Sequence, residues 1–153
     1  MAYYAVYLGA AGWDHAEWVG PFYPEELPAE WRLAFYNTQY RCVYLERAAW
    51  TDVAPDIWAQ WAQETQEDFR FVLEASASSG RNAAVVEALG GRAVLVDSVQ
   101  DARLLWFDAA TDLRALADRL RSQWGQGPVY LISRDAGLER LAQVRTMLDL
   151  MGL

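Results

Sequence analysis

The stretch Ala93–Phe107 reads AVLVDSVQDARLLWF, and it contains two short apolar runs that are typical of buried strands. The runs are Ala93–Val96 and Arg103–Phe107, and only the six residues between Val96 and Arg103 separate them. A crossover between parallel strands takes about a dozen residues or more, usually including a helix. The two strands therefore either pair antiparallel, or a short irregular connection replaces a helix at this point.

Outward from this junction, short apolar strands alternate with helices along the chain. The other predicted strands are Tyr3–Gly9, Cys42–Glu46, Arg70–Ala75 and Pro128–Ile132. The predicted helices begin at Pro24 and at Pro55 and cover Asn82–Leu89, Thr111–Trp124 and Asp135–Met151, with Asp135 as an N-cap. Continuously apolar strands that alternate with helices are typical of a parallel sheet covered by helices. The sequence therefore predicts one α/β domain, residues 1–153, with about six mainly parallel strands.

Length and charge exclude several classes of protein. A chain of 153 residues suits one domain. The formal net charge is −8, every basic residue is Arg, and no Arg cluster offsets the acidic excess, so nucleic-acid binding is not expected. The start shows no signal peptide, and no apolar run reaches the roughly 18 to 20 residues of a membrane span, so we expect a cytoplasmic protein without membrane contact. The single cysteine, Cys42, lies in an apolar strand and is expected to be a buried, unreactive thiol.

Aromatic and proline motifs near the N-terminus resemble the opening of a known family. Gly12-Trp13 is followed by Trp18-Val-Gly-Pro-Phe-Tyr-Pro24, and Phe69-Arg-Phe71 closes a Trp-rich helix. This pattern resembles the YecE-like family, a domain of unknown function that folds as a TIM barrel, and the last two strand–helix units resemble that family more weakly. The resemblance implies a shortened and divergent member. Its fold would be a truncated TIM-barrel-like fold that lacks about two central units at the Val96–Arg103 junction.

The polar residues at the strand ends differ from the pattern that the resemblance implies. An acid and an Asn of the family's second strand correspond here to Tyr44 and Glu46, and a Lys of its third strand corresponds to Glu74. The Asn pair of the family's final strand falls near Arg134 and Asp135. These departures indicate that the family's site is not maintained in its usual form.

Chemistry in a barrel is expected in the loops after the carboxyl ends of the strands. Those loops carry acids and the only histidine, and the candidate catalytic residues are His15, Glu46 and Glu74. With Asp97 they offer ligand types that suit Mg²⁺, Mn²⁺ or Fe²⁺, and a carboxylate pair could act as general acid and base. Helix N-caps and solvated loop charges explain acids at such positions equally well. We therefore assign no metal and no cofactor.

Three tryptophans lie in or beside the same loops at the carboxyl ends of the strands, and they allow two interpretations. Trp13, Trp18 and Trp50 either line a pocket for a small ligand or roof the barrel as structure. The residues assigned to binding of a small-molecule ligand are Trp13, Asp14, Arg47, Trp50 and Arg134.

The sequence favours a non-catalytic binding or interaction protein with an altered family site. The alternative is a small enzyme, metal-assisted or not, which requires His15, Glu46 and Glu74 to converge in one pocket. A barrel without its central units has open strand edges that favour pairing with a second subunit, so we expect a homodimer. The candidate surface is the last helix, with an apolar stripe of Leu141, Val144, Leu148 and Met151 and with Leu150 and Leu153 nearby.

Overall fold

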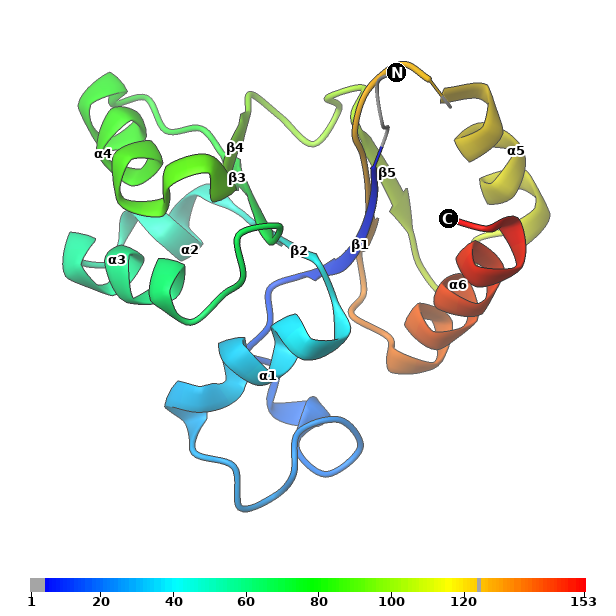
Figure 1. Ribbon diagram of the computed structural model, residues 1–153, viewed down its shortest axis with the longest axis horizontal. Coiled ribbons are helices and arrows are strands. Elements are labelled where there is room, and N and C mark those ends of the chain that lie inside the picture. The colour runs from blue at the N-terminus through cyan, green and yellow to red at the C-terminus, as the bar shows by residue number, and fades with distance from the viewer. Residues whose placement is uncertain (1–4, 124) are drawn as a thin grey trace.

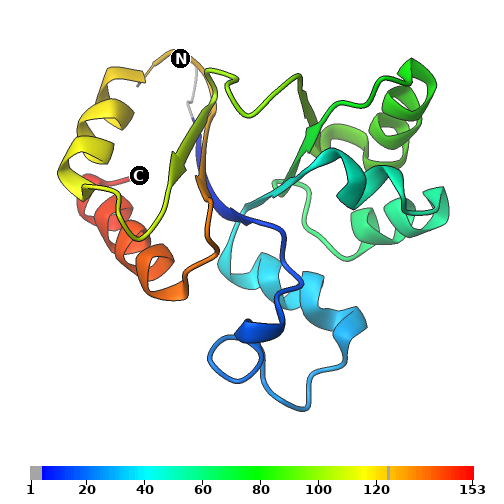
Figure 2. The same ribbon diagram turned by 180° about the vertical axis from the view of Figure 1, so that it is seen from behind.

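The structure is a computed structural model that describes residues 5–123 and 125–153. Within these residues, six parallel strands form one sheet in the order β4-β3-β2-β1-β6-β5. The strands are β1 (Val6–Ala11), β2 (Cys42–Leu45), β3 (Arg70–Glu74), β4 (Ala93–Val96), β5 (Leu104–Phe107) and β6 (Val129–Ser133). The sheet curls into a half-barrel with helices around its outside (Figures 1 and 2). The predicted truncated, barrel-like α/β fold is confirmed.

Helices follow most of the strands and cover the outer face of the sheet. In the described residues they are α1 (Arg32–Gln39), α2 (Arg47–Thr51), α3 (Pro55–Gln63), α4 (Ser79–Leu89), α5 (Leu113–Gln123) and α6 (Leu138–Met151), with short 3₁₀ helices at Ala16–Trp18, Ala29–Trp31 and Gly90–Arg92. Figure 1 shows α2, α3 and α4 beside β3 and β4 on one side of the molecule, and α5 and α6 on the other side. Helix α1 lies between these two groups.

Four helix starts differ from those predicted, two of them by only two or three residues, since α4 begins at Ser79 instead of Asn82 and α5 at Leu113 instead of Thr111. The helix expected from Pro24 begins instead with the 3₁₀ turn Ala29–Trp31, because Pro28 has no N–H to donate and disfavours helical backbone at the residue before it. Asp135 is not the N-cap of α6, which begins after Gly137. Its carboxylate accepts a hydrogen bond from the Gly137 N–H at 3.1 Å and so shapes the loop ahead of the helix.

A further difference concerns one short helix. The sequence does not predict α2, since this helix spans only five residues and has no helical repeat of apolar positions. Tyr3 of the first predicted strand and Trp124 of the fifth predicted helix lie outside the described residues.

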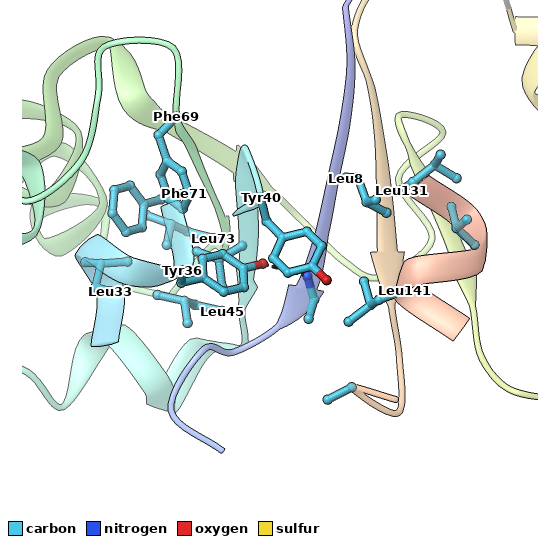
Figure 3. Close-up of a cluster of buried hydrophobic side chains, with 14 of the residues drawn as sticks. Leu8, Leu33, Tyr36, Tyr40, Leu45, Phe69, Phe71, Leu73, Leu131 and Leu141 are labelled. Atoms are coloured by element: carbon cyan, nitrogen blue, oxygen red, sulfur yellow. Dashed lines mark hydrogen bonds between the residues drawn. The ribbon is translucent and has the colours of Figure 1, made fainter. Parts of the chain in front are cut away.

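Outward-pointing side chains of the strands meet the helices in the larger hydrophobic core. Figure 3 shows the rings of Tyr36 and Tyr40 in the middle of this core. Around them lie Leu33, Leu45, Phe69, Phe71 and Leu73 on one side and Leu8, Leu131 and Leu141 on the other. Leu141, Val144 and Leu148 of α6 are buried in this core, so most of the stripe that was expected to form a dimer surface packs inside its own chain.

The inner, concave face of the sheet is also apolar and buried. Its residues are Tyr7, Cys42, Tyr44, Val72, Val96, Leu104, Tyr130 and Ile132. The rings of Tyr44 in β2 and Trp106 in β5 meet edge to face with their centroids 4.9 Å apart, although β1 and β6 lie between these strands in the sheet. Neighbouring strands are about 4.8 Å apart, so the two rings can meet only because the sheet is strongly curled. The prediction of a buried Cys42 is confirmed, and burial raises the pKa of its thiol.

The Val96–Arg103 junction is an irregular connection, and the strands that it joins do not pair with each other. β4 and β5 are the two edges of the sheet, and each runs parallel to its single neighbour. The connection crosses between these edges (Figure 1), where the indole N–H of Trp106 donates to the carbonyl of Val99 at 2.8 Å. Antiparallel pairing is therefore wrong, and the alternative of a short irregular connection is confirmed.

A tyrosine hydroxyl is inserted between β1 and β2. The hydroxyl of Tyr36 accepts a hydrogen bond from the Ala10 N–H at 2.8 Å and donates to the Cys42 carbonyl at 2.6 Å. Gly9 lies opposite Cys42, and a Cβ atom on Gly9 would stand 1.9 Å from that carbonyl oxygen. The close approach that the hydroxyl bridges therefore requires glycine at position 9.

Candidate functional site

The parallel strands direct all their carboxyl ends toward one end of the half-barrel. Acidic side chains at or after the strand ends are Asp14, Glu46, Glu74, Asp97, Asp108 and Asp135. Some of them are paired with arginines, as in Asp14–Arg32, Glu74–Arg47 and Asp108–Arg134. The rim is therefore a mixture of neutralised pairs and carboxylates that have no cationic partner among the described residues.

His15 is held against the main chain of the loop after β1. Its Nε2 atom lies 2.9 Å from the carbonyl oxygen of Ala11 and 3.1 Å from that of Gly12. Both neighbours are acceptors, so Nε2 carries a proton and donates to them. The imidazole also packs on the indole of Trp18, with ring centroids 4.5 Å apart. These contacts fix the turn that leaves β1.

Glu74 anchors the start of α2. Its Oε1 atom accepts a hydrogen bond from the main-chain N–H of Arg47 at 2.9 Å and lies 4.0 Å from the guanidinium Nε. The main-chain carbonyl of Glu74 accepts from the indole N–H of Trp50 at 2.8 Å. A carboxylate at a helix start satisfies a free N–H and suits the helix dipole.

Glu46, the last of the three candidate catalytic residues, is exposed and lines a cavity between the ends of β1 and β2. The cavity has a volume of about 280 Å³ and is lined by Ala11, Gly12, Tyr44, Leu45, Glu46 and Ala49. Neither His15 nor Glu74 is among its lining residues. Of the three side chains, that of Glu46 therefore lies at the cavity, whereas those of His15 and Glu74 form hydrogen bonds with the main chain.

Tyr44 also lines this cavity, although no binding role is predicted for it from the sequence. Only 5% of Tyr44 is exposed, and in the described part of the chain its buried hydroxyl has no hydrogen-bond partner. Burial raises the pKa of Tyr44 to about 12, with the charges of Glu74 and Glu46 acting in the same direction and Arg47 opposing them. The available signal was the strand alternation, which places Tyr44 beside Cys42 on the concave face.

The tryptophans of the rim are structural neighbours of the loops and do not share one pocket. Trp50 and Trp18 are fully buried, and the indole N–H of Trp18 donates to the carbonyl of Ala136 at 2.9 Å. The rings of Trp13 and Trp61 meet edge to face, with their centroids 5.1 Å apart. Trp13 lines a different cavity of about 310 Å³ over α1 and α3.

The charged residues assigned to ligand binding lie at separate points of the rim. Asp14 pairs with Arg32, and Arg47 donates to the carbonyl of Ala75 at 2.8 Å besides contacting Glu74. The guanidinium group of Arg134 lies 5.6 Å from the ring centre of Trp106. The assignment of these residues to one ligand therefore stays a prediction.

A metal centre is not formed by the described side chains. Within residues 5–123 and 125–153, no three His, Cys, Asp or Glu side chains lie close enough together to hold a metal ion. Asp97, the fourth ligand considered from sequence, is exposed after β4. Across the same residues, none of the helices is both long and apolar enough to cross a bilayer.

Comparisons with known proteins agree with the half-barrel. A family model described as "Protein of unknown function DUF72" matches residues 7–151. A crystal structure of a DUF72 family protein from Thermotoga maritima aligns over 95% of this chain and 100% of its own, with a TM-score of 0.64 and 12% identity. At this identity the similarity shows the fold alone.

Longer relatives are also similar to the chain. Two crystal structures of a DUF72 family protein from Enterococcus faecalis align over 82% and 97% of this chain, with TM-scores of 0.40 and 0.39 and identities of 15% and 16%. The matched parts are 50% and 59% of those chains, so this chain spans little more than half their length. The search of curated proteins found no match.

Proposed function

The chain belongs to the DUF72 family, which includes the YecE-like proteins that its sequence resembles, and we propose that it is a non-catalytic binding or interaction protein. The family's description states no activity. A shared barrel architecture does not determine activity either, because many unrelated reactions occur on it. The proposal therefore rests on what the side chains at the carboxyl end do in this chain.

The main support is that two of the three candidate catalytic side chains hold the main chain. His15 donates to the carbonyls of Ala11 and Gly12, and Glu74 accepts from the N–H of Arg47. A general acid or base must gain and lose a proton during turnover. Loss of the Nε2 proton of His15 would break the contacts that fix the loop after β1, and protonation of Glu74 would weaken its hydrogen bond to the start of α2.

An enzyme that uses His15, Glu46 and Glu74 is the alternative. It needs all three side chains around one substrate atom or one metal ion. Of the three, Glu46 alone lines the cavity at this end. We propose that this cavity binds a small molecule, and that the protein acts in the cytoplasm, where a single thiol such as that of Cys42 stays reduced.

A titration with Mn²⁺, followed by electron paramagnetic resonance, tests the metal-assisted form of the enzyme against the proposed function. A non-catalytic binding protein without a metal centre is expected to leave the Mn²⁺ signal unchanged apart from weak, non-saturable loss. The Glu46→Gln and Glu74→Gln variants should behave like the wild type. Saturable uptake of one ion that either substitution abolishes would support the enzyme and contradict the proposal.

We further propose that the partner of the interaction function is a second copy of this chain. The support is a groove of about 650 Å³ between α5 and α6, lined by Leu113, Ala117, Arg121, Arg140, Gln143, Thr146, Met147, Leu150 and Met151. Leu150 stands on this face with 85% of its surface exposed. In a dimer with two-fold symmetry one face meets itself, so each Leu150 side chain could enter the groove of the other copy.

A further inference from the structure

We propose that the cavity between β1 and β2 binds a small organic cation that carries N–H donors, such as a primary alkylammonium group, with Glu46 and Tyr44 as its polar contacts. This inference rests on the proposed binding function of the carboxyl end and names its ligand class. It combines two independent features, an unneutralised carboxylate at the cavity and a buried hydroxyl that lacks a partner.

Glu46 supplies the charge. It is the only ionised side chain that lines the cavity, and it forms no ion pair with any residue in 5–123 or 125–153. By contrast, Glu74 and Asp108 on the same rim have arginine partners. A carboxylate at a concave site in a protein of net charge −8 attracts cations and repels anions.

Tyr44 supplies the second contact. Buried hydroxyl groups are nearly always hydrogen-bonded, and one that lacks a partner costs free energy. The hydroxyl of Tyr44 has no partner within the described residues, and the residue lines the same cavity as Glu46. The oxygen itself is covered, so a ligand N–H that displaces the lining enough to reach it would satisfy it, because the protonated phenol still has acceptor lone pairs.

The rest of the lining favours an alkyl stem. Ala11, Gly12, Leu45 and Ala49 present small or apolar surface, and no Arg or His of the described part of the chain lines the cavity. The carbonyls of Ala11 and Gly12 already receive the proton of His15, so the ligand's donors are left to the carboxylate and the phenol. The site is therefore suited to a compact cation and unsuited to a phosphate or carboxylate.

Four probes of similar size test this inference by heteronuclear NMR, with the amide signals of Gly12, Leu45 and Ala49 as reporters. The probes are butylammonium, tetramethylammonium, butanol and butyrate. Butylammonium is expected to shift the three signals saturably. It should also bind more tightly than tetramethylammonium, which has no N–H. Butanol and butyrate should leave them unchanged.

Variants identify the contacts. Glu46→Gln is expected to weaken butylammonium binding roughly tenfold, and Tyr44→Phe about threefold to tenfold, as for a charged and a neutral hydrogen bond respectively. Glu87→Gln on the exposed face of α4 removes the same charge far from the cavity and should change the affinity by less than about twofold.

The outcomes separate this inference from the proposed function. If butanol or butyrate bound as tightly as butylammonium, as judged by these signals, the preference for a cation would be wrong. The cavity would still be a binding site for small molecules. Butylammonium binding that survives Glu46→Gln unchanged would overturn the assigned contacts. If none of the probes shifts the signals, the proposed class of ligand is wrong. The proposed binding function is then judged by whether other compounds occupy the cavity.

Discussion

The guanidinium group of Arg103 donates a hydrogen bond from Nη2 to the main-chain carbonyl of Leu95, across 3.2 Å. The two residues belong to opposite edges of the sheet, since Leu95 lies in β4 and Arg103 directly precedes β5. The bond therefore joins the two edges of the half-barrel without closing the sheet into a ring. Asp101 orients the guanidinium through contacts of 3.0 and 2.8 Å, and Arg103 in turn lowers the pKa of Asp101.

Arg103→Gln should loosen the edges of the sheet. We expect faster hydrogen exchange at the amides of β4 and β5, and a loss of about 1 kcal/mol in the free energy of unfolding, because a partly exposed hydrogen bond is removed. Arg119→Gln, on the exposed face of α5, is the matched control and should leave both quantities unchanged. Unaltered exchange in β4 of the Arg103 variant would show that this bond does not hold the edges together.

Gly9→Ala should prevent folding or lower the free energy of unfolding by several kcal/mol. The added Cβ atom would lie 1.9 Å from the carbonyl oxygen of Cys42, which belongs to a strand and cannot move aside without breaking the Tyr36 bridge. Gly91→Ala is the control, because nothing lies within 4 Å of a Cβ atom there. Urea denaturation of both variants measures the difference. A Gly9→Ala protein as stable as the wild type would contradict the close approach of β1 and β2.

Alkaline pH should destabilise the protein partly through Tyr44. Its pKa is near 10 in the unfolded chain and about 12 in the folded protein, so the unfolded state loses its proton first. The contribution of Tyr44 is therefore constant below about pH 10, and stability falls between about pH 10 and 12. Urea denaturation at pH 8 to 11.5 measures this slope, and Tyr44→Phe should reduce it. An identical slope in the variant would mean that the hydroxyl is not buried as described.

The dimer proposal predicts a mass of about twice 17.3 kDa in light scattering coupled to size-exclusion chromatography. Leu150→Asp should give the monomer, because a carboxylate would enter the apolar groove of the second copy. Val86→Asp is the control on α4, where the side chain is 39% exposed and far from the groove in the sequence. A wild-type mass of 17.3 kDa at tens of micromolar protein would reject the dimer.

The fold could be predicted from the sequence to the extent that it depends on apolar strands. Runs such as Cys42–Leu45 are buried on both faces, which produces the continuous apolar pattern that predicts a parallel sheet. The short spacing at Val96–Arg103 also correctly predicted an irregular connection at this point of the chain. It could not show that β4 and β5 form opposite edges, because that depends on the curl of the sheet.

The candidate site was less predictable. Position in the chain placed His15, Glu46 and Glu74 at the same end of the half-barrel, but hydrogen bonds to main-chain groups decide the direction of the His15 and Glu74 side chains. The bond from the Arg47 N–H to Glu74, 27 residues apart, is an example that no local pattern reveals. Tyr44 was overlooked because an aromatic residue in a strand is usually core, and only its lack of a hydrogen-bond partner sets it apart.

We propose above that the carboxyl end of this half-barrel binds a ligand without transforming it. Proton NMR on one sample of the protein with a mixture of small polar and cationic compounds tests both parts, because saturation transfer reports binding and the compounds' own signals report conversion. We expect saturation transfer to at least one compound, weaker in the Glu46→Gln protein, with every compound chemically unchanged after a day. Steady consumption of a compound by the wild type, stopped by Glu46→Gln or Glu74→Gln, would contradict it.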